Sequence, residues 1–171
     1  MENKILVAYA SKYGSTKEIA EKIGEVLKQV GVAAVVADLK SARDITPYQN
    51  IVIGSAMYMG QWRKEAVNFL KNNEAALSQR KVWVFGTGPS GKGDPAQLLK
   101  GVTMPAKVKE IVDRIKPQDS TVFHGNLDAA RMSGFEKWIV KRVGGGAGDF
   151  RDWQMITDWA NKIAGAIKKA G

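Results

Sequence analysis

The chain has no cysteine among its 171 residues and a single histidine, His124. The lack of cysteine excludes disulfides, thiolate nucleophiles, cysteine-ligated iron–sulfur clusters and cysteine-based zinc sites. One histidine cannot form a histidine-rich metal site, so His124 is expected in the core or at a strand end, without a chemical role. We expect no metal site.

Long apolar runs are also missing, because none approaches the roughly 20 residues that span a bilayer. The N-terminus continues directly into strand-like sequence, without the separate apolar segment and cleavage site of a secretory signal. The composition, with 44% hydrophobic and 25% charged residues, is typical of a soluble globular protein. We therefore expect a cytoplasmic protein, with one compact domain over residues 1–171 because no change in composition suggests a second.

Acidic residues are scarce relative to basic ones, and the formal net charge is +9. Such a charge favours an acidic partner, an anionic membrane surface or nucleic acid, although scattered solvated lysines and arginines give the same total. No nucleic-acid recognition motif accompanies the charge, so nucleic acid is not an expected partner.

Short apolar runs alternate with segments of helical periodicity. The runs are rich in valine and isoleucine, as expected of parallel strands covered on both faces, and they cover residues 4–10, 32–38, 50–56, 81–87 and 119–125. Apolar residues at helical spacing predict helices over residues 19–30, 64–78, 106–115 and 151–169. Because right-handed crossovers place helices on both faces of a parallel sheet, this alternation predicts a doubly wound α/β fold with five strands.

The stretch "SKYGST", residues 11–16, follows the first strand at the edge where such sheets bind ligands. Gly14 permits a tight turn, the hydroxyl groups can donate hydrogen bonds, and the N-terminus of the next helix is electropositive. These features suit a phosphate group. An ordinary turn with Ser15 or Thr16 as the helix N-cap explains the stretch about as well, so the other loops must decide.

Two other nucleotide sites can be rejected from the sequence. "GTGPSGKG", residues 86–93, has the glycine and lysine spacing of an ATP-binding P-loop, but Gly93 stands where a serine or threonine should hold magnesium. Residues 11–16 contain one glycine, whereas a dinucleotide fingerprint needs three. The later "VGGGAGDF", residues 143–150, lies between helical segments and is expected to be a flexible connector.

Three loops together resemble the flavodoxin family. "SKYGST" is similar to the flavodoxin phosphate loop, with Tyr13 in place of its central threonine, and "GSAMYMGQW" and "GTGPSGKGDP" follow the third and fourth strands, where flavodoxins hold the isoalloxazine ring. The resemblance implies a flavodoxin-like sheet of order 2-1-3-4-5 and one FMN, with its phosphate on residues 11–16 and its ring between residues 56–62 and 87–94. The candidate FMN-binding residues are Ser11, Lys12, Tyr13, Gly14, Ser15, Thr16, Ala56, Met57, Tyr58, Met59, Gly60, Trp62, Thr87, Gly88, Pro89, Ser90 and Gly91.

The chemistry of the ring loops agrees with this assignment. Methionine and aromatic side chains between Met57 and Trp62 offer flat or polarisable surfaces to a flavin, and Gly60 permits close backbone approach. Trp62 could equally pad the edge of the sheet. The loop after the fourth strand lacks the acidic residues and the stacking tyrosine usual in flavodoxins, which implies unusual redox potentials. No side chain is expected to act as a catalytic acid or base, because the flavin carries the chemistry.

The segment "FEKWIVKRVGGGAGDFRDWQMITDW", residues 135–159, is similar to the C-terminal region of the menaquinone-dependent protoporphyrinogen IX dehydrogenases. This resemblance implies an FMN oxidoreductase acting on a porphyrinogen with a quinone as redox partner. A soluble flavodoxin-type carrier that docks on another redox protein is the alternative. If residues 134–143 are helical, Phe135 and Trp138 flanked by Lys137 and Lys141 suit peripheral contact with an anionic membrane, although a solvated face with a core stripe has the same pattern.

Overall fold

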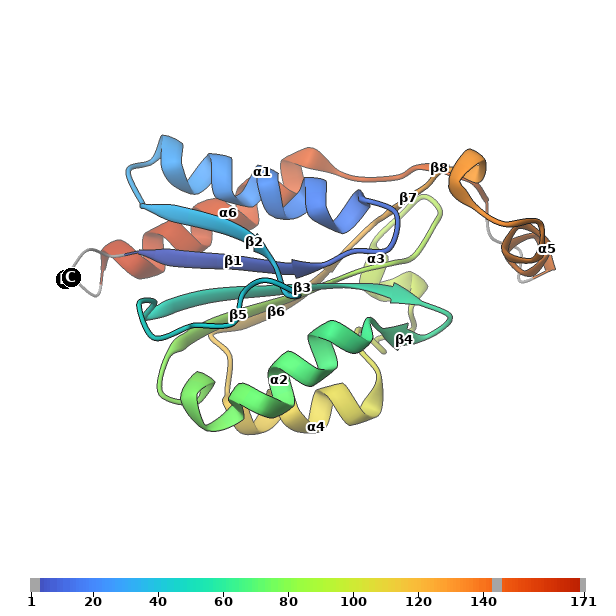
Figure 1. Cartoon of the computed structure of the whole chain (residues 1–171). Helices are drawn as coiled ribbons and strands as arrows, with labels where there is room; N and C mark the ends of the chain where they lie inside the picture. Colours follow the sequence, from blue (N-terminus) through green and yellow to red (C-terminus); the bar gives the residue numbers. More distant parts are fainter. Residues whose placement is uncertain (1–3, 143–145, 170–171) are drawn as a thin grey trace.

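The computed structural model describes residues 4–142 and 146–169, which form an α/β sandwich of three layers (Figure 1). Its central sheet has the order β2-β1-β3-β5-β6, and neighbouring strands on this path run parallel. These strands are β1 (Ile5–Ala10), β2 (Ala34–Asp38), β3 (Asn50–Tyr58), β5 (Lys81–Thr87) and β6 (Asp119–Phe123). The predicted five parallel strands and their order are confirmed. The short β4 (Gln61–Trp62), which was not predicted, pairs antiparallel with β3.

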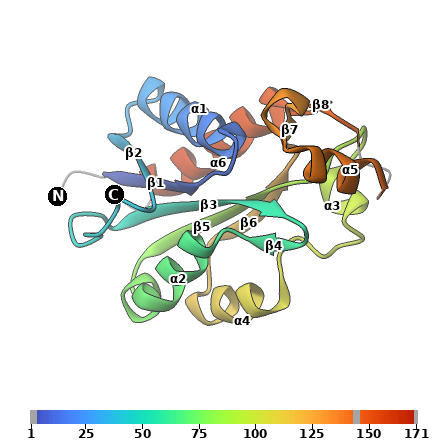
Figure 2. The ribbon, with the colours of Figure 1, turned by 45° about the vertical axis from the view of Figure 1, so that its right-hand side comes forward.

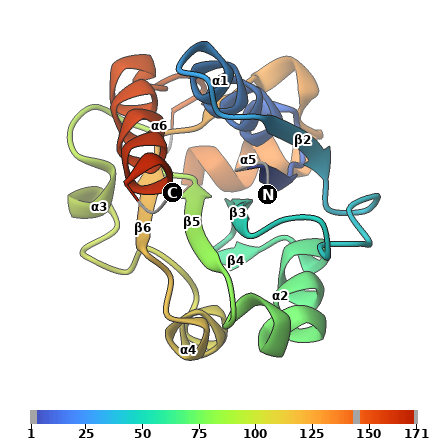
Figure 3. The same ribbon diagram turned by 90° about the vertical axis from the view of Figure 1, so that its left-hand side faces the viewer.

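Helices cover both faces of the sheet, as predicted. One face carries α1 (Ser15–Gln29) and α6 (Trp153–Lys168), and the other carries α2 (Lys64–Leu77) and α4 (Ala106–Ile115) (Figures 1 and 3). The amphipathic pattern explains this arrangement, because α4 buries Val108, Ile111, Val112 and Ile115 at three- and four-residue spacing. A short α3 (Pro95–Leu98) precedes α4. Among the described residues, none of the helices combines the length and hydrophobicity that crossing a membrane requires.

The sheet separates two hydrophobic clusters. Along β1, Ile5, Val7 and Tyr9 face α1 and α6, whereas the alternate residues face α2 and α4. On the first face Phe85, Phe123 and Trp159 pack with ring centroids 5.7, 5.9 and 5.6 Å apart, in tilted and edge-to-face geometry. These buried contacts fix the carboxyl ends of β5 and β6, which carry two of the loops discussed below.

Between β6 and α6 the chain leaves the sandwich and returns, and we call residues 126–149 the excursion. It begins with β7 (Asn126–Leu127) and ends with β8 (Gly148–Asp149), which pair antiparallel, and between them lie the 3-10 turn η1 (Ala129–Arg131) and helix α5 (Gly134–Arg142) (Figure 2). A backbone hydrogen bond of 3.2 Å from Phe150 N to Gly125 O closes its base. Helix α5 projects beyond the carboxyl ends of the strands (Figure 1).

The excursion corrects one expectation from the sequence. Residues 143–150 were expected to be a flexible connector, but Gly148 and Asp149 form a strand with β7. A pairing of two residues has no periodicity that a sequence pattern can register. Residues 143–145 lie outside the described part of the chain, so the expectation is not examined there.

Candidate functional site

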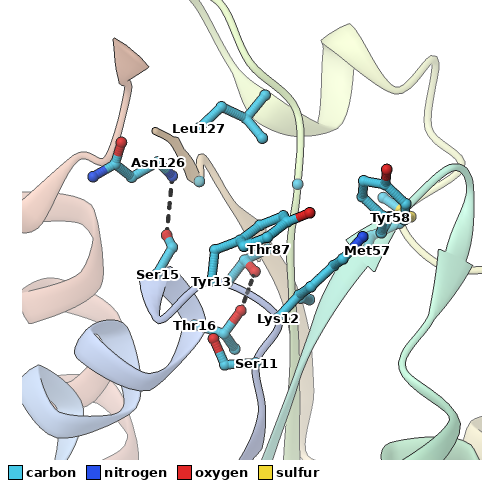
Figure 4. Close-up of a pocket in the computed structure, with 13 residues that line it drawn as sticks. Ser11, Lys12, Tyr13, Ser15, Thr16, Met57, Tyr58, Thr87, Asn126 and Leu127 are labelled. Carbon is cyan, nitrogen blue, oxygen red and sulfur yellow. Dashed lines mark hydrogen bonds between the residues drawn. The ribbon is translucent and has the colours of Figure 1, made fainter. Parts of the chain in front are cut away.

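A pocket lies at the carboxyl edge of the sheet, where the loops after β1 and β5 meet the end of β3 and strand β7 (Figure 4). Parallel strands place all their carboxyl ends at one edge, so residues far apart in the sequence converge there. The lining residues are Ser11, Lys12, Tyr13, Ser15, Thr16, Ala56, Met57, Tyr58, Thr87, Gly88, Gly125, Asn126 and Leu127. The three loops that the sequence singled out are therefore brought together.

The loop after β1 has the geometry of an anion site. Gly14 is the N-cap of α1 with φ of 96°, and no side chain caps this helix end. A left-handed conformation favours glycine, and the uncapped amides of the first turn can donate to an anion. The alternative in which Ser15 or Thr16 is the N-cap does not occur, since both lie inside α1. Gly14 N donates to Ser11 Oγ over 3.0 Å, which folds the loop back on itself.

Two hydroxyl groups of this loop tie it to its neighbours. The Oγ1 atoms of Thr16 and Thr87 are 2.6 Å apart, and both residues are buried. Ser15 Oγ accepts a hydrogen bond of 2.9 Å from Asn126 N, and its own hydrogen remains available to a ligand. The loop is thus held against both β5 and the excursion.

The first ring loop is a tight β3–β4 hairpin. Its two central residues, Met59 and Gly60, have φ of 50° and 72°. Positive φ at both positions is the signature of a type I′ turn, whose twist matches the flanking strands. The turn leaves Met59 65% exposed.

The second ring loop approaches the first closely at Gly88. A Cβ atom on Gly88 would stand 3.2 Å from Met57 Cε and 3.3 Å from Met57 Cβ, so a larger residue there would press on Met57. His124, which is buried directly after β6 as expected, has Nδ1 2.8 Å from Pro89 O and Nε2 2.7 Å from Gly93 O. Carbonyl oxygens only accept hydrogen bonds, so the ring donates from a nitrogen that carries hydrogen, and His124 lies between the two ends of residues 89–93. These contacts position the loop.

Several predicted site residues lie elsewhere. Trp62 is 5% exposed and packs in the core on the α2 and α4 side of the sheet, because its pairing with Met57 in the hairpin turns it inward. This is the position that the alternative interpretation gave it. Met59, Ser90 and Gly91 do not line the pocket, while Gly60 and Pro89 line a neighbouring groove.

This groove is apolar and opens beside the ring loops. It shares two residues with the pocket, Met57 and Gly88, so the two hollows adjoin. Its complete lining is Met57, Gly60, Gly88, Pro89, Leu99, Val102, Met104 and Pro105. Val102 is 63% exposed, so the groove presents an apolar side chain to solvent.

A charged cluster joins α5 to the pocket. Lys12 forms an ion pair with Glu136 of α5, and its ammonium group lies 3.5 Å from the centroid of the Tyr58 ring. Tyr58 OH donates to Glu136 Oε1 over 3.1 Å. Burial is the largest single effect on the pKa of Lys12 and lowers it, but the hydrogen bonds to Glu136 and Tyr13 and the nearby tyrosines together outweigh burial, so the net pKa is raised. The hydrogen bond from Lys12, followed by one from Tyr13, holds the pKa of Glu136 well below its usual range.

A family model described as "Flavodoxin domain" matches residues 6–153 of this chain. The chain belongs to the flavodoxin domain family. A curated relative of this flavodoxin-domain protein is the protoporphyrinogen IX dehydrogenase [quinone] of Escherichia coli K12, which is 22% identical over 172 residues covering 94% of each chain.

Solved structures have the same fold. Flavodoxin 2 from Bacillus cereus is 23% identical and superposes with a TM-score of 0.63 over 95% of this chain and 99% of its own. The rubredoxin oxygen:oxidoreductase of Desulfovibrio gigas superposes with a TM-score of 0.65 at 15% identity over 98% of this chain. This chain spans only 36% of the length of that enzyme.

Flavodoxin domains bind FMN, and the pocket of this flavodoxin-domain protein fits that cofactor. The uncapped N-terminus of α1 and the hydroxyl groups of Ser11 and Ser15 suit its phosphate. Met57, Tyr58 and Gly88 line the other end of the pocket and give it a largely apolar surface, which suits a flat ring. FMN is therefore the cofactor of this protein.

Sequence reasoning missed the contribution of the excursion. Gly125, Asn126 and Leu127 line the pocket, and Arg131 donates to Tyr13 O in the phosphate loop. The only signal was the short "HGNLD" stretch, residues 124–128, which has no periodicity and carries no chemical group that requires a ligand. Glu136 gave no signal either, since its partner Lys12 is 124 positions away.

Proposed function

We propose that this flavodoxin-domain protein is an FMN oxidoreductase of the protoporphyrinogen IX dehydrogenase (quinone) type, with a porphyrinogen as substrate and a quinone as redox partner. The similarity to the Escherichia coli enzyme supports the proposal because it covers 94% of both chains. We further propose that residues 1–171 form one FMN-binding domain.

The observation that carries the proposal is the apolar groove beside the FMN pocket. Because the groove and the pocket share Met57 and Gly88, an apolar ring compound in the groove would lie next to the flavin. Exposed Lys92 and Lys100 belong to the segments that flank the groove, and they can pair with the carboxylates of a porphyrinogen. A protein carrier needs no such apolar recess, since docking between redox proteins depends mainly on complementary charge.

The residues of the site have separate roles in binding FMN and in shielding it from water. When bound, FMN supplies the capacity to accept and pass on electrons or hydride. The amides at the start of α1 and the hydroxyl of Ser11 hold the phosphate end. Met57 and Gly88 position the ring, while Leu127 and the loop held by His124 restrict the access of water. No acid or base from the chain is required.

Helix α5 supports peripheral contact with an anionic membrane, where quinones are found. The rings of Phe135 and Trp138 stack with centroids 6.1 Å apart and are 69% and 54% exposed. Arg142 lies 5.0 Å from the Trp138 ring, and Lys137 and Lys141 are exposed beside them. Because no residue of α5 is buried, this face is not a core stripe. We propose that it rests on the inner face of the membrane, with aromatic side chains at the interface and basic ones toward anionic lipid.

The test is a screen of electron donors and acceptors with purified holoprotein. We expect protoporphyrinogen IX to reduce the flavin and menaquinone analogues to reoxidise it. Val102→Glu, which places a charge in the groove, should slow both reactions at least severalfold and leave FMN affinity unchanged. Gln118→Glu adds the same charge to an exposed position at the opposite edge of the sheet and should have no effect. Rapid exchange with reduced ferredoxin alone would contradict the proposal and favour a soluble electron carrier.

A further inference from the structure

Lys12 belongs to the phosphate loop, yet its side chain points to the other end of the pocket. Figure 4 shows it extending from the loop after β1 toward Tyr58 and Met57 of the first ring loop. Its ammonium group lies 3.5 Å from the centroid of the Tyr58 ring and 4.9 Å from that of Tyr13. Two aromatic faces attract a cation at these distances, so the side chain is held across the pocket.

Glu136 fixes this orientation from outside the pocket. Its own position is fixed by a capping box at the start of α5, in which Ser133 N donates to Glu136 Oε2 over 2.9 Å and Glu136 N donates to Ser133 Oγ over 3.2 Å. The other carboxylate oxygen accepts from Lys12 and from Tyr58 OH. Glu136 does not line the pocket, whereas Lys12 does. The cation therefore faces the pocket, and its counter-charge stands behind it.

The charge of Lys12 is unusual in this environment. Among the described residues that line the pocket, it is the only one with a charged side chain. Its side chain is 24% exposed and that of Glu136 is 16% exposed, so water screens them less than it screens surface charges. A positive charge beside a flavin favours its reduced form, because reduction adds negative charge to the ring.

We propose that Lys12, positioned by Glu136 and Tyr58, is the cation that stabilises reduced FMN in this protein and so raises the redox potential of the flavin. The proposal goes beyond the substrate assignment, and it depends only on the ring lying beside Tyr58. It also gives α5 a second role, since the helix that carries Phe135 and Trp138 holds the residue that orients Lys12.

The test compares the affinity of the protein for oxidised and reduced FMN in three variants. Lys12→Met removes the charge and keeps an unbranched apolar chain. The affinity for reduced FMN, divided by the affinity for oxidised FMN, should fall roughly tenfold, as expected for the loss of one partly screened charge. Glu136→Gln removes the counter-charge, and the ratio should move in favour of the reduced form. Tyr58→Phe keeps the aromatic face, and its shift should be smaller than either.

Riboflavin, which lacks the phosphate, separates a ring contact from a phosphate contact. If Lys12 acts on the ring, Lys12→Met shifts the ratio equally for riboflavin and FMN. If Lys12→Met weakens oxidised and reduced FMN alike and leaves riboflavin unaffected, Lys12 is a phosphate ligand and the proposal is wrong. A Glu136→Gln protein whose affinity ratio equals that of the wild type would also overturn it, even if Lys12→Met does not fold. Neither result bears on whether a porphyrinogen or a quinone is the partner, which the activity screen decides separately.

Discussion

Gly14 combines two demands in one residue. Its φ of 96° lies in the left-handed region, and its position as N-cap of α1 places it where the phosphate of FMN is expected. A side chain at this φ is strained wherever it occurs in the chain. A substitution at Gly14 therefore affects stability and cofactor binding together, and the two effects can be separated only with a matched control.

Gly31 provides that control, because it has φ of 84°, lies beyond the other end of α1 and has open space around its Cβ position. We expect Gly14→Ala and Gly31→Ala each to lower the free energy of unfolding by roughly 1 to 2 kcal/mol. Only Gly14→Ala should weaken FMN binding. Urea denaturation and titration with FMN measure the two quantities. Equal FMN affinity in both variants would show that the loop does not hold the phosphate.

The hydrogen bond between Thr16 and Thr87 is a second residue-scale feature that joins the phosphate loop to β5. Both hydroxyls are buried, so replacing one threonine by the isosteric valine leaves the other without a partner. We expect Thr16→Val or Thr87→Val to cost about 1 to 3 kcal/mol of unfolding free energy, and the double variant to cost less than the sum. A double-mutant cycle in urea measures the coupling. Additive costs would mean that the two side chains do not interact.

At the scale of elements, the attachment of α5 depends on ionised groups. Lys12 is the main cause of the lowered pKa of Glu136, whose ordinary value is 4.5. A carboxyl group with a lowered pKa in the folded state stabilises that state above its ordinary pKa, and the stabilisation is lost as the pH falls below it. The pKa of Lys12 is raised in the folded state. Lys12 therefore stabilises the folded state at every pH below its ordinary pKa of 10.5, and this stabilisation is lost only at higher pH.

We therefore expect α5 to be held firmly at neutral pH and to loosen in acid. Amide hydrogen exchange, corrected for the intrinsic effect of pH, should give lower protection factors for residues 134–142 at pH 4 than at pH 7. In Glu136→Gln the protection should be low at both pH values, because the ion pair is absent. If the protection factors of α1 also fall between pH 7 and pH 4, acid destabilises the whole fold and does not release α5 specifically.

Local patterns explain how much of the architecture was predictable. The five strands and the four long helices each carry an apolar repeat of their own, and α4 was predicted with its observed bounds. The loop after β1 could be predicted as an anion site because Gly14 and its neighbouring hydroxyls are adjacent in sequence. The contacts of Asn126 and Glu136 with this loop depend on the path of the excursion, which no local pattern encodes. The sequence left two positions open for Trp62 for a similar reason, since the β4 pairing that turns it inward covers only two residues.

For the whole molecule, the net charge of +9 raises the question of whether membrane contact is specific to α5. Each lysine near an anionic leaflet contributes about 1 kcal/mol, so a few of them support weak adsorption that salt reverses. We expect the protein to sediment with anionic vesicles at low salt, and neither with neutral vesicles nor at high salt.

Two variants with the same net charge test the specificity. Lys137→Glu with Lys141→Glu should abolish vesicle binding, whereas Lys162→Glu with Lys168→Glu, on exposed positions of α6, should largely retain it. Equal losses in both variants would mean that overall charge alone drives adsorption. No binding of the wild-type protein to anionic vesicles would exclude the membrane role of α5 and favour the soluble carrier.

The hydrogen bond from Phe150 N to Gly125 O brings the two ends of the excursion together at one point of the sandwich. A segment whose ends meet can be gained or lost in a single genetic event, because the strands and helices on either side need not move. The excursion carries both the outward aromatic face of α5 and Glu136, the carboxylate that pairs with Lys12. A change confined to this one segment would therefore alter both the proposed membrane contact and the proposed stabilisation of reduced FMN.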